Sequence, residues 1–222
     1  MIKKLSAAAV ALAAAFGAHA ATVSFQYGIP LSLTTTEINQ TGSLGLFDSN
    51  LGILTGASLA VFGGAVFTFG GTNTGAAPMT SEMTSSVDLF WSSSLAALNP
   101  FLADSIGLSA TSGNQTYNVN ETKNFGPFDT SASLSDNLGA ILVSLQAAGG
   151  GSFDVTCRSA SGFLVNSVNG FLSSRHATTA GCGAMVTYTY DERRTTVPEP
   201  TSLALAGLAL AAAGMSARRR KA

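Results

Sequence analysis

The side chains able to do chemistry in this sequence are few and widely spaced. Ser173, Ser174 and Arg175 precede His176, so two hydroxyls lie beside an imidazole. A serine hydrolase needs a nucleophile hydrogen-bonded to a base that an acid orients, and neighbours in sequence rarely achieve this. No G-x-S-x-G nucleophile elbow is present. We therefore expect His176 to be a polar loop residue rather than a catalytic base.

Carboxylates are the other candidate catalytic groups. A pair of them can hydrolyse a glycosidic bond if folding brings them about 5–10 Å apart, but sequence spacing does not reveal such a pair. Calcium loops place Asp or Asn at alternate positions with a glycine, and Asp48-Ser49-Asn50 and Asp191-Glu192 match this pattern only in part. We expect no catalytic, cofactor or metal site. Asp48 is expected to cap the backbone two residues further on.

Trp91 is the one tryptophan and the best candidate for stacking on a sugar ring. It alternates with Leu89 and Val87, while Asp88 takes the opposite face, so burial in a core is the expectation. The region 21–197 holds eleven acidic and five basic residues, a net charge of about −6. A negative body disfavours nucleic acid as a partner.

Most of the body has the period-two pattern of β-strands. The pattern predicts strands with one buried face in residues 25–38, 53–62, 85–93, 151–159 and 184–192. Gly63-Gly64 predicts a hairpin turn after the second stretch. Residues 93–102 favour a single helical turn ending at Asn99, and residues 135–150 fit a helix or a buried strand equally well. Gly- and Asn-rich turns between short strands indicate an all-β fold, an antiparallel, jelly-roll-like β-sandwich over residues 21–190.

The N-terminus has the three parts of a secretory signal peptide. Lys3 and Lys4 precede an apolar stretch from Leu5 to Gly17, and an Ala18-His19-Ala20 cleavage site follows. We expect signal peptidase to cut after Ala20, with an uncleaved anchor as the alternative.

An exported chain with two cysteines favours a Cys157–Cys182 disulfide. Two buried free thiols are the alternative. Cys157 ends one predicted strand and Cys182 precedes another, so the bridge is expected to join two strands or an adjoining loop near the C-terminal edge of the sandwich.

The C-terminus places an uncharged stretch, residues 201–217, between Glu199 and a basic tail. As a helix, this stretch is about 26 Å long, slightly less than a hydrocarbon core of about 30 Å. The basic tail would keep the C-terminus cytoplasmic. We therefore expect a single transmembrane helix at 201–217, after a linker at 191–197.

This end resembles a PEP-CTERM sorting signal, here assigned to residues 198–222 plus Val197. The resemblance is carried by three parts in order. They are the Pro-Glu-Pro triplet with the valine before it (Val197, Pro198, Glu199, Pro200), the apolar stretch 201–217 and the arginine cluster (Arg218, Arg219, Arg220). It implies recognition and cleavage by exosortase, a membrane-embedded protease of Gram-negative bacteria that make extracellular polysaccharide. A simple retained membrane anchor is the alternative.

The body is similar to choice-of-anchor E domains in three stretches. Residues 46–55 resemble their FDxxLGxL opening, residues 149–156 their Gly-rich entry to a late strand, and residues 186–190 their closing strand. The resemblance brings no defined activity.

Together these features predict a non-enzymatic protein that passes through the inner membrane and reaches the cell surface or extracellular matrix. There it would act in adhesion or as a structural component, with extracellular polysaccharide as a candidate partner. A carbohydrate-binding module and, less favoured, a polysaccharide-modifying hydrolase are the alternatives.

Overall fold

The computed structural model describes residues 20–168, 171–193 and 207. The chain divides after Glu192 into two units, and all the strands belong to the first. Within the described residues, no helix is long and apolar enough to cross a membrane. Apart from Gly207, the predicted transmembrane segment 201–217 lies outside these residues, as do the cleavage-site residue Ala18 and the sorting residues 197–200 and 218–220.

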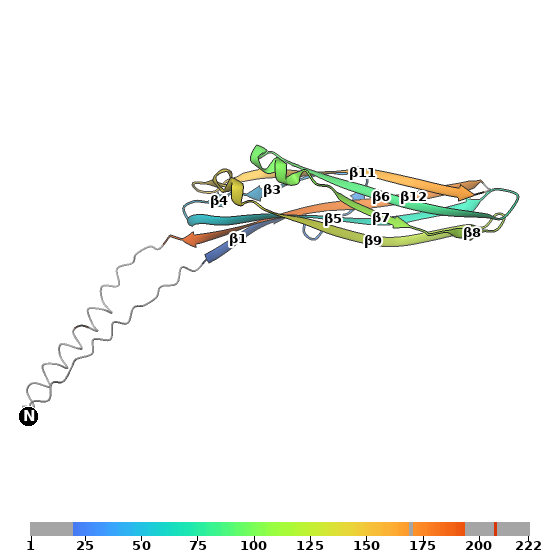
Figure 1. The fold of residues 1–222 in the computed structure, drawn as a ribbon, viewed down its shortest axis with the longest axis horizontal. Coiled ribbons are helices and arrows are strands. Elements are labelled where there is room, and N and C mark those ends of the chain that lie inside the picture. Colours follow the sequence, from blue (N-terminus) through green and yellow to red (C-terminus); the bar gives the residue numbers. More distant parts are fainter. Residues whose placement is uncertain (1–19, 169–170, 194–206, 208–222) are drawn as a thin grey trace, which may run out of the picture. The chain divides into compact units, whose positions relative to one another are not determined.

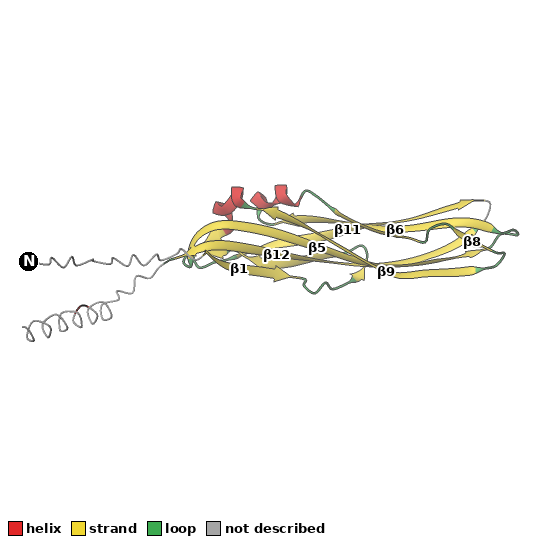
Figure 2. Cartoon of the chain, turned by 60° about the horizontal axis from the view of Figure 1, so that its bottom comes forward, coloured by secondary structure: helices red, strands yellow, loops and turns green. Residues whose placement is uncertain are grey.

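The body consists of two long antiparallel sheets that face each other (Figures 1 and 2). Sheet A has the order β1-β12-β5-β9, with β2 also pairing with β12. Its strands are β1 (Ala20–Tyr27), β2 (Thr34–Thr35), β5 (Gly52–Asn73), β9 (Thr122–Asn137) and β12 (Leu172–Glu192). Sheet B has the order β3-β11-β6-β7, with β8 also pairing with β6. Its strands are β3 (Asn39–Gly45), β6 (Met79–Ser93), β7 (Ile106–Thr111), β8 (Gln115–Tyr117) and β11 (Ser152–Val168).

Alternation in the sequence predicts the buried faces of the central strands correctly. Val87, Leu89 and Trp91 of β6 point into the core, and Asp88 is exposed. Tyr188 of β12 is also fully buried. The prediction succeeds because a strand in a two-layer fold buries every second side chain. An all-β, antiparallel sandwich-like body is thereby confirmed.

The hairpin predicted at Gly63-Gly64 is wrong, because β5 runs through both glycines without a turn. The glycines permit close packing of neighbours instead. A Cβ atom on Gly63 would lie 2.3 Å from Cδ1 of Leu89 in the facing sheet, and one on Gly64 would lie 2.8 Å from Cδ1 of Leu31. A strand glycine signals either a turn or a close approach, and here it is the second.

A β-bulge changes which side chains are buried at the start of β5, where period-two alternation predicts Ile53 and Thr55 on the same face as Ala57. Ile53 is 68% exposed, whereas its neighbour Leu54 is 8% exposed. Tyr190 pairs with Leu54 but Thr189 pairs with Gly56, so Thr55 is an extra residue on β5. The extra residue reverses the inside–outside alternation.

The predicted strand at 25–38 is interrupted. β1 ends at Tyr27, and residues 28–33 form a loop over the outer face of sheet A before β2 begins. Gly181 of β12 makes room for this loop, since a Cβ atom there would lie 2.6 Å from the carbonyl oxygen of Ser32. The alternation of Leu31 and Leu33 therefore does not mark a strand.

The two helical candidates are short 3-10 helices. η1 (Ala96–Leu102) extends past the predicted end at Asn99. Its Asn99 side chain accepts from Ser93 N–H at 2.7 Å and donates to Ser93 O at 3.2 Å, which holds η1 at the end of β6. η2 (Gly139–Leu145) runs into β10 (Gln146–Ala147), which pairs in parallel with β4 (Phe47–Asp48). Residues 135–150 therefore contain a short helix, whereas their strand residues, 135–137 and 146–147, are exposed or half-buried and not the predicted buried strand.

Candidate functional site

The predicted disulfide is present and joins the two sheets. Cys157 of β11 and Cys182 of β12 are bonded, with their Cα atoms 6.3 Å apart. Both residues lie in the middle of their strands and are almost fully buried. The expected position near the C-terminal edge is wrong, because both strands are longer than the sequence pattern suggested. The bridge is therefore a structural cross-link through the core, not an accessible redox group.

Asp48 caps the backbone as predicted, and it also fastens a second loop. Its Oδ1 atom accepts a hydrogen bond from Asn50 N–H at 2.9 Å and another from Gly149 N–H at 2.8 Å. Gly149 and Gly150 both have a φ of +80°, which an L side chain rarely adopts. The carboxylate thus joins residues 48–50 to a glycine loop about a hundred positions later in the chain.

An aromatic cluster lies next to Asp48. Phe47 is fully buried, with its ring centroid 5.9 Å from that of Tyr188 and 5.0 Å from that of Tyr190. The Tyr188 hydroxyl donates to Gly45 O at 2.9 Å, and burial raises its pKa above the ordinary value. The three stretches that resemble choice-of-anchor E domains therefore contact one another. The three stretches pack together at one end of the sandwich, and a linear motif does not reveal these contacts.

We expect Asp48→Ala to destabilise the body by about 1–2 kcal/mol, because two backbone N–H groups lose their charged acceptor at a site where water can partly replace it. Asp48→Asn retains an acceptor oxygen and should lose less. Urea unfolding followed by circular dichroism measures both. Asp136→Ala is the control, since Asp136 is exposed on β9. An Asp48→Ala variant as stable as the Asp136→Ala variant would contradict the structural role.

His176 lies in strand β12, so its placement in a loop is wrong. Its ring stacks on that of Phe163 from β11, with centroids 4.3 Å apart and planes 13° apart. Arg175, the preceding residue, donates a hydrogen bond to Asn124 Oδ1 across the intervening strand β5. The histidine therefore closes the gap between the two sheets. Among the described residues, no group of three or more His, Cys, Asp or Glu side chains could hold a metal ion.

A groove of about 610 Å³ lies on the outer face of sheet A beside the loop at 28–33. Its walls are mostly apolar and include neither a carboxylate nor a histidine. The lining residues are Gln26, Ile29, Pro30, Leu31, Phe62, Gly63, Ser131, Ala132, Ser133 and Met185. This groove does not supply the carboxylate pair that glycoside hydrolysis requires.

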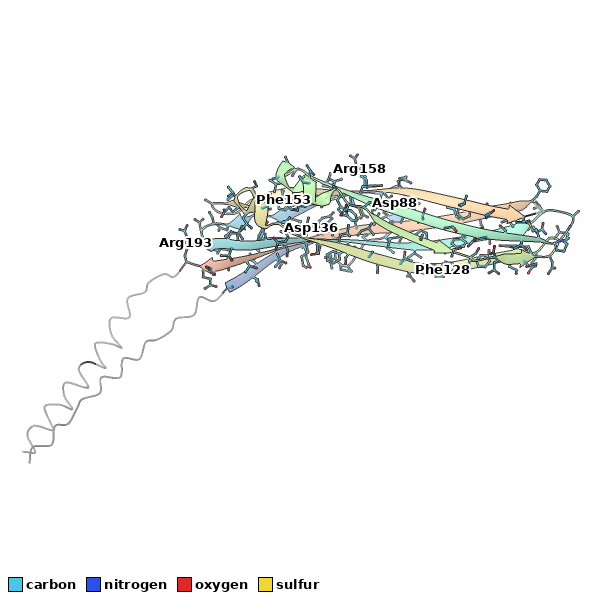
Figure 3. All side chains as sticks on the ribbon, viewed as in Figure 1. Asp88, Phe128, Asp136, Phe153, Arg158 and Arg193 are labelled. Carbon is cyan, nitrogen blue, oxygen red and sulfur yellow. A yellow bond between two sulfur atoms is a disulfide. The ribbon has the colours of Figure 1, made fainter. Side chains whose placement is uncertain are left out.

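The outer face of sheet B is rich in hydroxyl groups. Outward-pointing serines and threonines come from four neighbouring strands, namely Thr41, Ser43, Thr80, Thr84, Ser86, Ser92, Ser109, Thr111 and Thr156. Phe90, which is 47% exposed, pairs with Arg158 on this face. Figure 3 shows Arg158 on β11 and Asp88 on β6. We call this surface the hydroxyl face. Sequence reasoning missed it because its four strands become neighbours only through the strand order of sheet B.

The C-terminal end of the chain is similar to a known sorting motif. The profile of the PEP-CTERM protein-sorting motif matches residues 196–221. The chain carries a PEP-CTERM sorting motif. This motif implies an exported protein that exosortase processes and that is sorted to the surface of a Gram-negative cell. The predicted sorting signal is confirmed at this level, although its side chains lie outside the described residues.

Other comparisons add little. No curated protein matches the chain. The structure of infectious bursal disease virus Gx strain is similar at 8% identity, over 78% of this chain and 37% of that chain, with a TM-score of 0.18. The Gt strain structure has 12% identity, over 87% and 45%, with a TM-score of 0.10. The chain thus spans less than half of either viral chain, and scores this low do not indicate a shared fold.

Proposed function

We propose that this protein is a non-enzymatic component of the extracellular matrix, where its body adheres to extracellular polysaccharide. The observation that carries the proposal is the PEP-CTERM motif at residues 196–221, attached to an all-β body. A sorting address with a stable, disulfide-linked body suits a protein that works outside the cell, where disulfides persist. Signal peptidase is the second processing partner, and it would release the N-terminus after Ala20.

The hydroxyl face is the surface that we assign to the polymer. Hydroxyl groups both donate and accept hydrogen bonds, as sugar hydroxyls do. The face also carries Phe90, whose ring can cover the apolar side of a sugar. Trp91, by contrast, is 7% exposed, so it does not offer the open platform that a tryptophan-based carbohydrate module needs. Broad, weak contact with a polymer therefore fits this surface better than a deep sugar pocket.

We also propose that the body is a choice-of-anchor E domain. Support comes from the contacts between its three similar stretches, made by Asp48 to Gly149 and by Phe47 to Tyr188 and Tyr190.

A strain lacking the protein should form biofilm with less retained polysaccharide. Complementation with the full-length chain should restore the retained polysaccharide. The variant Thr84→Glu/Ser109→Glu on the hydroxyl face should instead be released into the medium, because the added carboxylates disrupt hydrogen bonding with the polymer. Ser131→Glu/Ser133→Glu is the matched control, with two exposed serines changed on β9 of the other sheet. Immunoblots of matrix and medium measure retention. Unchanged biofilm in the deletion strain, or equal retention of both variants, would refute the proposal.

A further inference from the structure

The side of the sandwich formed by β11 and β12 is covered along only part of its length. Residues 34–38 cross from sheet A to sheet B on this side. The carboxylate of Glu37 accepts hydrogen bonds from the N–H and the hydroxyl of Ser161, at 2.9 and 2.8 Å. From Gly162 to Val168, β6 is the one described strand that pairs with β11. β11 therefore ends in an open strand edge.

The orientation of the backbone follows from Ser161. Its N–H points away from β6, because it bonds to Glu37. Backbone groups of an antiparallel strand point to alternate sides at successive residues. The N–H and C=O groups of Phe163 and Val165 therefore face the open side, available to another strand.

This edge lacks the features that protect exposed strands. Residues 161–168 contain no charge and no proline. Side chains on their outward face include Leu164, which is 66% exposed, and Val168, which is 59% exposed. The long edge strand β9 is different, since it carries Lys123, Asp129 and Asp136, and a bulge beside Pro127. Charges, prolines and bulges are the usual means of blocking edge-to-edge pairing.

We propose that two copies of the chain pair through this edge, with β11 antiparallel to β11 of the second copy about a two-fold axis at Leu164. Phe163 then pairs with Val165 of the other copy, and the reverse pair forms by symmetry. Each pair exchanges two N–H···O bonds. The result is one sheet B continuous across the dimer, an isologous contact in which each copy uses the same segment.

The choice of register follows from the side chains. Pairing about Leu164 brings the two exposed leucines together and matches Phe163 with Val165. A shift of the axis to Val165 also satisfies the backbone but places Leu164 against Asn166 and Phe163 against Ser167. Apolar cross-strand pairs are more favourable than such mixed pairs, so the first register is expected.

Charge favours a second copy that meets at this segment. The body has a net charge of about −6 between residues 21 and 197, so copies repel one another over most approaches. Residues 162–166, which pair about this axis, are neutral, so their pairing brings no like charges directly opposite. The Glu37 carboxylate lies beyond them, at Ser161.

Disulfide trapping of the exported full-length chain tests both the pairing and its register. Residue 164 sits directly across from its own copy in a non-hydrogen-bonded pair, where Cα atoms are about 4.5 Å apart. Leu164→Cys should therefore cross-link to a covalent dimer under mild oxidation. Asn166→Cys is the matched control on the same face, because the two copies of residue 166 are about 13 Å apart at ~3.3 Å per residue, beyond the reach of a disulfide. The native cysteines are already paired, so each variant has one free thiol.

Light scattering of the unmodified protein should give twice the mass of one chain. Leu164→Lys should give the mass of a single chain with an unchanged circular dichroism spectrum, which shows that the chain still folds. A single-chain mass for the unmodified protein at all concentrations would overturn the proposal. So would cross-linking of Leu164→Cys that is no stronger than that of Asn166→Cys, or cross-linking to a chain of different mass.

Discussion

Replacement of Pro198, Glu199 and Pro200 by alanine is expected to stop removal of the tail, so that the protein accumulates in the cell envelope instead of at the surface. Proline lacks a backbone N–H and disfavours helix at the residue before it, so we expect a protease to read the triplet as an extended strip. Alanine has the highest helix propensity, and three alanines would extend the adjoining apolar segment as helix. The substrate strip of exosortase would then be lost.

Mass spectrometry of the mature C-terminus measures this outcome. The unmodified protein on the surface should end near residue 200, without Arg218–Arg220, whereas the triple-alanine variant should keep them. Thr195→Ala is the control, because this residue lies just outside the matched range 196–221. An intact arginine cluster on unmodified surface protein would show that the tail is a retained anchor and not a processed signal.

The sorting motif was predictable because it is a linear signal that a membrane enzyme reads. Buried strand faces were predictable for a similar reason, since the spacing of Val87, Leu89 and Trp91 alone places them on one face of a strand. Strand ends were not, because a glycine such as Gly63 has the same local signature in a turn as at a close contact with Leu89. The difference depends on the facing sheet, which no local pattern contains.

The candidate surfaces of the body depend on strand order in the same way. Thr84 and Thr111 become neighbours because β6 pairs with β7, and Thr156 joins the same face because β11 pairs with β6 on its other side. Phe163 and His176 meet because β11 and β12 lie in opposite sheets. The sequence around each of these residues does not reveal which residue it contacts. Recognising the surface requires the sheet order that brings the residues together.

Loss of the Cys157–Cys182 bridge should destabilise the body by about 3–4 kcal/mol, mainly because the cross-link restricts the unfolded chain over 25 residues. Cys157→Ala/Cys182→Ala tests this in urea unfolding. The slope of the unfolding free energy against urea should rise at the same time, since an unlinked unfolded chain exposes more surface. Removal of the buried sulfur atoms from the folded core adds a smaller cost.

The single variants distinguish a cross-link from two independent core residues. Cys157→Ala and Cys182→Ala each abolish the bond, so each should cost nearly as much as the double variant, and the two losses should not add. Two separate thiols packed in the core would give additive losses and an unchanged urea slope. Because the bridge holds β11 at Cys157, five residues before the open segment begins at Gly162, its loss should also weaken the dimer proposed above. Additive single losses would show that the sheets are held together by packing alone.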